Sequence, residues 1–162
     1  MAPSLRGVAA PAALIPEGPT LRHRLRLAKL RARGVTIHGT PLVGANVTIA
    51  GPVVLNANSS IGDGSTLRGN VTIQEGAVLG ERCRLIAKTG IAIGRNALLG
   101  DGVVLTDFEP DPGDAERPTR DQPLRTAPIA VGDGARVGHG ACLLAGARVK
   151  PGGSVAPNTV LR

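Results

Sequence analysis

The stretch LNANSSIGDGSTLRGNVTIQEGAVL, residues 55–79, carries Leu or Ile at every sixth position. The same spacing of aliphatic residues extends back to Ile37 and forward to Ile91 without a break. An α-helix has a period of 3.6 residues and a simple strand a period of 2, so neither explains a period of six. A six-residue unit instead describes a short strand followed by a tight turn, repeated along the chain.

Small residues and turn formers recur at fixed places between the aliphatic residues. The fourth residue after each aliphatic one is usually small, as at Ser65, Ala77 and Cys83, and turn formers lie between, as in GDG at 62–64 and 132–134. Gly and Asn supply the positive φ angles that tight turns need. The pattern predicts a parallel β-helix of five or six stacked coils, three units to a triangular coil, with the aliphatic side chains inside.

The repeat is interrupted twice. Its phase slips by two residues, from Ile91 to Ile93, and after Leu105 it stops until Val131. The second interruption, residues 106–128, is rich in proline and charged residues and is expected to be an extended, structureless excursion. A loop of this length inside a compact domain is uncommon unless it has a function.

Composition limits the classes of protein that fit. The 162 residues include 23 Gly and 13 Pro, and Phe108 is the only aromatic side chain of the Phe, Tyr and Trp type. The net charge of +7 favours partners that carry phosphate, whereas the lack of aromatic residues to stack on bases argues against nucleic acid. Cys83 and Cys142 are interpreted as small buried residues of a reducing cytosol. No apolar run is long enough for an integral membrane segment, so we expect a cytoplasmic protein.

Residues 20–33, TLRHRLRLAKLRAR, predict a helix that covers one open end of the solenoid. Thr20 is suited to cap the helix and Gly34 to end it. One apolar stripe on this helix consists of Leu21, Leu25, Ala28 and Ala32, with Leu27 and Leu30 outside it. Six of the 19 Lys and Arg residues also lie here. They indicate either an end cap with a solvated basic face or a helix that binds a membrane surface or RNA.

The expected organisation is therefore a flexible arm over residues 1–19, a helical cap over 20–34 and a β-helix over 35–162. The β-helix includes the excursion at 106–128.

The repeat resembles the hexapeptide-repeat (left-handed β-helix) acyltransferases, in particular the maltose, galactoside and lipopolysaccharide O-acetyltransferase branch. The resemblance is carried by IGRNALLGDGVVLTDFEP (93–110) and RTAPIAVGDGARVGHGACLLAGARVKPGGSVAPNTV (125–160). It implies an all-β, left-handed parallel β-helix that forms a homotrimer. It also implies that acetyl-CoA or another acyl-CoA, bound between subunits without a metal, acylates a hydroxyl or amine of a sugar or small natural product.

Glu109-Pro110 falls where this family commonly has a catalytic His-Pro pair, with Asp107 in the short acidic segment before it. A histidine suits proton abstraction because its ordinary pKa lies near neutral pH, whereas a glutamate is an ordinarily weak base. Three hypotheses remain open. Glu109 is a substitute base, the base lies elsewhere with His139 as the candidate, or the chain is a degenerate member that serves as a trimeric scaffold or runs a different reaction in the same cleft.

The resemblance also places His139 and Pro157 at positions that contact acyl-CoA. Arg136 replaces a tryptophan usual in its coil, and it could attract CoA phosphates together with Arg148, Lys150 and the terminal Arg162, or these four could be solvated surface charges. The segment VGHGACLLAG further resembles the γ-class carbonic anhydrases, but Leu144 stands where they have a second metal-binding histidine. Because one imidazole cannot hold a catalytic zinc ion, we reject that function.

Overall fold

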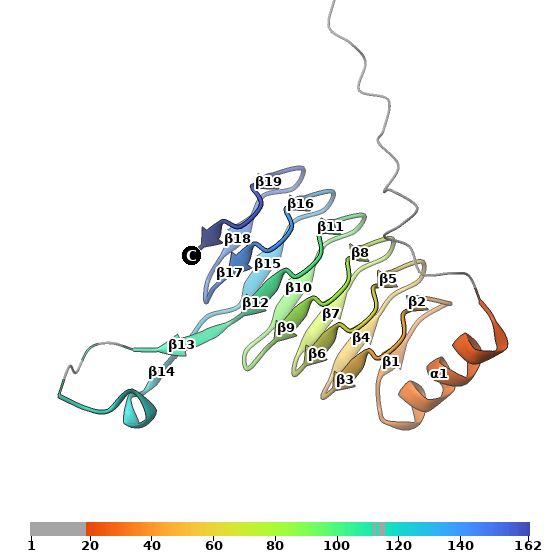
Figure 1. Cartoon of the computed structure of the whole chain (residues 1–162), viewed down its shortest axis with the longest axis horizontal. Helices are drawn as coiled ribbons and strands as arrows, with labels where there is room; N and C mark the ends of the chain where they lie inside the picture. Colours follow the sequence, from red (N-terminus) through yellow and green to blue (C-terminus); the bar gives the residue numbers. More distant parts are fainter. Residues whose placement is uncertain (1–18, 112, 114–115) are drawn as a thin grey trace, which may run out of the picture.

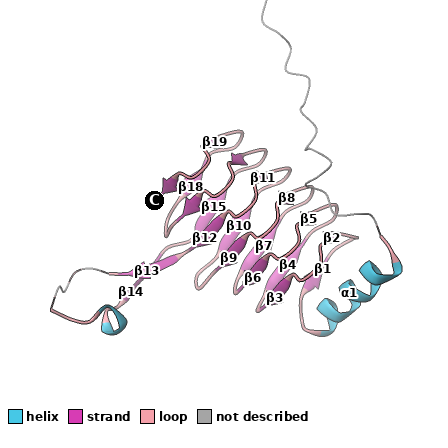
Figure 2. Ribbon diagram, in the orientation of Figure 1, coloured by secondary structure: helices cyan, strands magenta, loops and turns pink. Residues whose placement is uncertain are grey.

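The structure is a computed structural model that describes residues 19–111, 113 and 116–162. Three parallel sheets of six strands each form the walls of a triangular prism (Figures 1 and 2). The first sheet consists of β1 (Thr36–Ile37), β4 (Val53–Leu55), β7 (Val71–Ile73), β10 (Ile91–Ile93), β15 (Ile129–Val131) and β18 (Arg148–Val149). The second consists of β2 (Leu42–Val43), β5 (Ser60–Ile61), β8 (Val78–Leu79), β11 (Leu98–Leu99), β16 (Arg136–Val137) and β19 (Ser154–Val155). The third consists of β3 (Thr48–Ala50), β6 (Thr66–Arg68), β9 (Arg84–Ile86), β12 (Val104–Thr106), β17 (Cys142–Leu143) and β20 (Val160–Leu161).

The aliphatic residues that recur at every sixth position lie above one another in successive coils. Ile73 pairs in register with Leu55 on one side and with Ile93 on the other, and Ile93 pairs in turn with Val131. These side chains are at most 3 % exposed, and the small residues beside them, such as Ala77, are buried as well. The fold class, a left-handed parallel β-helix, is therefore confirmed, and six strands per sheet correspond to the upper end of the predicted five or six coils.

The predicted helical cap is present as α1 (Leu21–Ala32) at one end of the prism (Figure 1). The Thr20 hydroxyl accepts a hydrogen bond from the backbone N–H of His23, and Gly34 follows the helix with φ +87°. Residues 1–18, which include nearly all of the arm expected over 1–19, lie outside the described residues.

The side of α1 that packs on the solenoid is not the expected stripe. The buried residues of the helix are His23, Leu27 and Leu30, whereas Leu21 and Leu25 remain 74 % and 56 % exposed. Ala28 and Ala32 are exposed as well.

The physical reason for this orientation lies in the first coil, whose strand β2 has no preceding strand to pair with. Its Val43 N–H donates to Nε2 of His23, and its Val43 carbonyl accepts from the Arg26 guanidinium. The helix therefore turns toward the solenoid the face that can satisfy the polar edge of the sheet, because unpaired backbone groups are costly to bury.

The excursion is not structureless, contrary to expectation. β13 (Phe108–Pro110) and β14 (Leu124–Thr126) pair as an antiparallel ribbon that projects from the prism, and a short 3-10 helix, η2 (Thr119–Asp121), lies between them (Figure 2). Glu109 lies opposite Arg125 in the ribbon.

Both cysteines are free. Cys83 is buried, and burial raises the pKa of its thiol to about 11, so the thiol stays protonated at neutral pH. Cys142 is only half-buried, on the outer side of β17, which corrects the expectation that both are interior residues. Of the helices in the described residues, none is both long and apolar enough to cross a membrane.

Close stacking of turns makes some glycines irreplaceable, which a matched pair of variants tests. A Cβ at Gly69 (φ +84°) would overlap the carbonyl oxygen of Ala87 in the next coil, whereas a Cβ at Gly102 (φ +67°) would meet no atom within 4 Å. Gly102→Ala should cost only the left-handed backbone strain, about 1 kcal/mol. Gly69→Ala should cost more than about 3 kcal/mol in the free energy of urea unfolding, because backbone must move. Equal losses in the free energy of unfolding of the two variants would contradict the close stacking of the turns at Gly69 and Ala87.

Candidate functional site

The root of the excursion is organised by one buried carboxylate. Asp107, the first residue after β12, is fully buried, and its Oδ1 accepts a hydrogen bond from the Lys88 N–H at 2.7 Å. Its Oδ2 accepts from the Thr89 and Gly90 N–H groups, each also at 2.7 Å. The three donors belong to the turn between β9 and β10, where the repeat takes up its two additional residues. A single side chain therefore ties the two interruptions of the repeat together.

Backbone hydrogen bonds close the excursion at its neck. The Ala127 N–H donates to the Asp107 carbonyl at 3.0 Å, and the Ile129 N–H donates to the Gly90 carbonyl at 3.0 Å. The Lys88 ammonium also lies 4.9 Å from the centroid of the Phe108 ring, a cation–π contact between the solenoid turn and the first strand of the ribbon. The ribbon is thus held firmly where it leaves the prism.

Glu109 lies in this ribbon and is ion-paired. Its Oε1 accepts from Nη2 of Arg125 at 2.6 Å, and its side chain is 20 % exposed while that of Arg125 is 56 % exposed. No described residue donates a hydrogen bond to Oε2, which remains available to another donor. The carboxylate is therefore held in place by a charge-assisted bond with one oxygen uncommitted.

A shallow trough crosses the outer face of the first sheet beside the neck. Its first part, about 340 Å³, is bordered by Thr89, Gly90 and Pro128 at the neck and by Arg148 of β18. Its second part, about 410 Å³, shares Ala92 with the first and is lined by residues of the turn toward the second sheet, including Arg95 and Asp133. The trough is open and contains both polar and apolar groups. It adjoins the root of the excursion.

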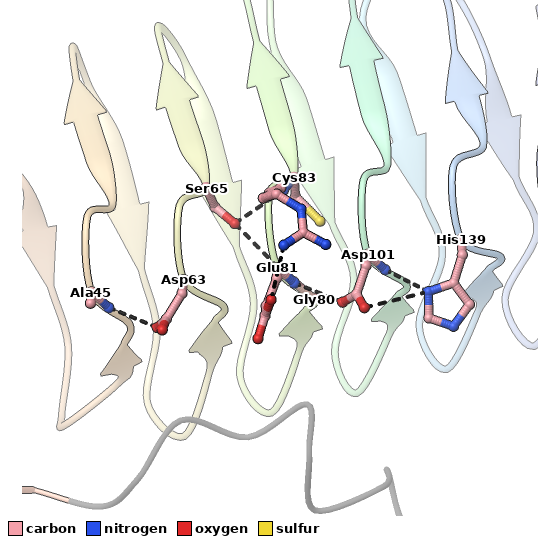
Figure 3. A network of polar contacts seen from close by, with 9 residues as sticks. Ala45, Asp63, Ser65, Gly80, Glu81, Cys83, Asp101 and His139 are labelled. Carbon is pink, nitrogen blue, oxygen red and sulfur yellow. Dashed lines mark hydrogen bonds and ion pairs between the residues drawn. The ribbon is translucent and has the colours of Figure 1, made fainter.

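His139 belongs to another corner of the prism, between the second and third sheets. Its Nδ1 accepts a hydrogen bond from the Asp101 N–H at 2.8 Å, and its ring is 64 % exposed (Figure 3). One coil earlier, Asp101 accepts in the same way from the Glu81 N–H at 2.8 Å. Asp63 does so from the Ala45 N–H, also at 2.8 Å. Asp63, Asp101 and His139 therefore form a ladder, in which each of these three side chains accepts a hydrogen bond from a backbone N–H of the preceding turn.

This hydrogen bond fixes the form of the imidazole. Nδ1 can accept only when it carries no proton, so the neutral ring of His139 carries its proton on Nε2. The exposed nitrogen is then a donor. A general base would need the opposite arrangement at the atom that faces a substrate.

The other residues expected to bind the cofactor do not converge. Arg148 borders the trough. Arg136 lies on β16 of the second sheet, Lys150 follows β18, Pro157 follows β19, and Arg162 ends the chain. All four are exposed. Within one copy of the chain, therefore, only Arg148 of these residues adjoins the neck.

Metal ligands do not gather in the part of the chain that the structure describes, where no three His, Cys, Asp or Glu residues lie close enough to share an ion. Two of the described histidines instead accept hydrogen bonds from the backbone, as His23 and His139 show.

Sequence reasoning missed two contributors to this site. Arg125 was not singled out, although it lies sixteen residues after Glu109 and faces it once the excursion folds as a hairpin. Asp107 is predicted as a catalytic candidate beside Glu109, but the sequence does not indicate its structural role, in which its buried carboxylate accepts hydrogen bonds from three backbone N–H groups. The available signal was the coincidence of a two-residue slip with an acidic residue one coil later, directly after a strand.

No protein-family model matches the sequence, and a comparison with curated proteins gave no match. Solved structures do match. A point mutant of AntD, an N-acyltransferase from Bacillus cereus in complex with dTDP-4-amino-4,6-dideoxyglucose and coenzyme A, superposes with a TM-score of 0.71 at 16 % identity, covering 83 % of this chain and 76 % of that one. PerB from Caulobacter crescentus, in complex with CoA and GDP-perosamine, gives a TM-score of 0.54 at 23 % identity. That match covers 85 % of this chain, which spans only 59 % of the length of PerB. At these identities the likeness establishes a shared fold.

The three hydrogen bonds to Asp107 predict that one substitution lowers the stability of the whole protein and also loosens the turn between β9 and β10. Asp107→Asn replaces one acceptor oxygen by an NH₂ group that faces backbone donors, and should cost about 3 kcal/mol in urea unfolding. Hydrogen exchange of a peptide covering residues 86–91 should also become faster, because the Lys88, Thr89 and Gly90 amides lose their acceptor. Asp121→Asn, at an exposed acidic residue of the excursion, is the control and should change neither. An unchanged rate of hydrogen exchange in Asp107→Asn would show that its carboxylate does not hold these three amides.

The ladder at His139 predicts which replacement is tolerated. Asn can present its Oδ1 where the Nδ1 of histidine lies, so His139→Asn should keep the stability of the parent protein. His139→Ala should lose about 1 kcal/mol, the value of one hydrogen bond. Thermal unfolding of both variants measures the difference. Equal destabilisation by Asn and Ala would show that acceptance from the Asp101 N–H does not matter.

Proposed function

We propose that this protein transfers an acyl group from acyl-CoA to an amine on a sugar or a similar small molecule. The observation that carries the proposal is a carboxylate held by an ion pair on a ribbon whose root adjoins the trough, on a fold shared with AntD and PerB. Those two proteins were solved with coenzyme A and with nucleotide-linked sugars, the two ligand classes proposed here.

The trough is open within one copy of the chain, so a second copy would have to complete a cleft. We propose a homotrimer in which the trough of one subunit faces its neighbour and acyl-CoA, with acetyl-CoA as the simplest case, lies between them. Arg148 at the trough would attract a CoA phosphate, and Arg136, Lys150 and Arg162 are the further exposed cations of these last coils. Pro157 and His139 would contribute to the wall through their turns. Such a cofactor is consistent with a cytoplasmic location.

Glu109 would accept the proton released in the reaction. The amine nitrogen attacks the thioester carbon, the new C–N bond forms, the C–S bond breaks, and CoA leaves as a thiolate. The N–H becomes much more acidic once nitrogen has bonded to carbon, so a weak base is sufficient to remove it. Glu109 would take this proton on Oε2 and pass it to the departing sulfur. Backbone N–H groups would stabilise the oxygen anion of the tetrahedral intermediate.

The nature of the base favours an amine over a hydroxyl acceptor. An alcohol has to lose its proton as it attacks, which requires a stronger base such as histidine. A carboxylate at the position where the resembling family has histidine is therefore better matched to acyl transfer to nitrogen. In this proposal Asp107 positions the ribbon by accepting hydrogen bonds from the turn between β9 and β10. His139 has a structural role, because it accepts a hydrogen bond from the Asp101 N–H.

The ion pair supports a second candidate function. Because Arg125 already neutralises Glu109, the pair is also what a purely structural ribbon would contain, and the chain would then be a trimeric scaffold without catalytic activity. The two functions differ in one respect that is easily measured, since a scaffold has no need of a cofactor cleft.

Two measurements on the full-length chain distinguish the candidates. Millimolar acetyl-CoA should raise the melting temperature of an enzyme that binds it. CoA thiol release should then appear with a nucleotide-linked 4-amino-4-deoxy sugar and be much slower with the matching 4-hydroxy sugar. The absence of both the thermal shift and thiol release across an amino-sugar series would favour the scaffold.

Substitution tests the role of Glu109 itself. Glu109→Gln keeps the shape of the side chain but removes its capacity to accept a proton, and should lower kcat by about 10²–10⁴-fold with little change in KM for acyl-CoA. Arg120→Gln, at an exposed arginine of the same excursion that lies 3.6 Å from Asp121, is the matched control and should leave kcat unchanged. An active Glu109→Gln enzyme would remove Glu109 from the mechanism while leaving the proposed reaction intact.

A further inference from the structure

The outer face of α1 presents an apolar stripe that the solenoid does not use. Leu21 and Leu25 are two of the four exposed large hydrophobic residues in the described part of the chain, and Leu21 is the most exposed of them. At about 100° per residue, the four residues of the stripe point directly away from the buried face formed by His23, Leu27 and Leu30. α1 lies at one end of the prism (Figure 1) and packs on the solenoid with His23, Leu27 and Leu30, so the stripe on its opposite side faces away from the solenoid.

Basic residues flank this stripe on both sides. On the same helical wheel, Arg24 and Arg31 fall on one side of the stripe and Arg22 and Lys29 on the other, and Arg33 follows the helix. The sequence of α1 contains no acidic residue. The helix therefore combines a narrow apolar ridge with cationic margins, the arrangement found in helices that lie in a membrane interface.

Most of these cations are not needed to hold the cap in place. Arg26 and Arg31 reach back to the carbonyl oxygens of Val43 and Gly39. Arg22, Arg24, Lys29 and Arg33 make no side-chain hydrogen bond or ion pair with any residue that the structure describes. Four exposed positive charges thus remain concentrated at one end of the molecule.

We propose that α1 docks this end of the protein on an anionic lipid surface, with the Leu21–Leu25 ridge inserted among the head groups and the cations over lipid phosphates. Charge complementarity selects this occupant, because an anionic surface matches four cations and a flat layer matches a helix lying across the blunt end of a prism. A second copy of the same face would bring like charges together. RNA offers no apolar partner for the leucines, and the face has no aromatic residue for base stacking.

The docking would be peripheral. α1 has 12 residues, a length of about 18 Å, which is far shorter than the hydrocarbon layer. The inference is independent of the proposed function, because it uses no residue of the trough or the ribbon.

Co-sedimentation of the full chain with vesicles tests the proposal. The protein should pellet with vesicles of phosphatidylcholine and phosphatidylglycerol (about 7:3) at about 50 mM salt, should remain in solution with pure phosphatidylcholine, and should be released at about 500 mM salt. Leu21→Asp/Leu25→Asp should lower the partition coefficient at least tenfold. Arg24→Gln/Lys29→Gln should lower it about 25-fold, since each charge near an anionic surface is worth about fivefold. Failure of the parent protein to bind the anionic vesicles would overturn the proposal.

Two controls separate the loss of docking from a general effect of added charge or of misfolding. Val160→Asp adds one carboxylate, half the charge that the aspartate pair adds, at a 61 % exposed valine in the last coil, at the opposite end of the prism, and should bind like the parent protein. Circular dichroism checks the folding of each variant, and Leu21→Ser/Leu25→Ser replaces the aspartate pair if that pair does not fold.

Two alternative occupants would be recognised directly. If a uridine oligoribonucleotide displaces the vesicles at low salt and Leu21→Asp/Leu25→Asp binds it as tightly as the parent, the partner is a nucleic acid and the proposal is wrong. If that substitution instead converts the assembly into a smaller species in sedimentation velocity, the ridge is an interface between copies, and the proposal is equally wrong.

Discussion

Backbone hydrogen bonding between successive coils is the constraint on which the rest of this structure depends. Each coil satisfies most of its N–H and C=O groups through the coil before it and the coil after it, and its aliphatic layer is shielded by those same neighbours. Where a neighbouring coil is missing or the spacing changes, a side chain has to take its place. At the first coil, His23 and Arg26 serve the edge at Val43. At the two-residue slip, Asp107 accepts from the three N–H groups of the widened turn.

The candidate site is a consequence of the hydrogen bonds that Asp107 makes at the two-residue slip. The widened turn and the excursion occur one coil apart at the same corner, and the Asp107 carboxylate joins them. This arrangement gives the ribbon a rigid base, places Glu109 two residues beyond a fully buried anchor, and leaves the trough open beside Gly90 and Pro128. A flexible loop would have provided the same residues without a defined position, and position is what general acid–base chemistry requires.

The solenoid could be predicted well because its signal is periodic and each position has one physical demand. An interior position needs an aliphatic side chain and a turn needs a residue that tolerates positive φ, so the register from Ile37 to Leu161 follows from counting. The cap was predicted as a helix, but its orientation was not. Leu21 and Leu25 form the better apolar stripe, yet the need of Val43 for hydrogen-bond partners determines which side faces inward. The Glu109–Arg125 pair also escaped prediction, because pairing across a hairpin depends on a turn whose position the sequence does not mark.

The positions of α1 and the trough relative to each other restrict what a membrane-docked enzyme could acylate. The trough lies on β7, β10 and β15, and β10 is three strands away from β1 in the first sheet. With coils spaced about 4.8 Å apart and a helix about 10 Å in diameter beneath the first coil, the trough stands roughly 25 Å from the surface on which α1 would lie. An amine in a lipid head group cannot cover that distance. A membrane-docked enzyme of this shape would therefore act on a water-soluble acceptor, or on one whose sugar is carried well away from its lipid by a long polar linker.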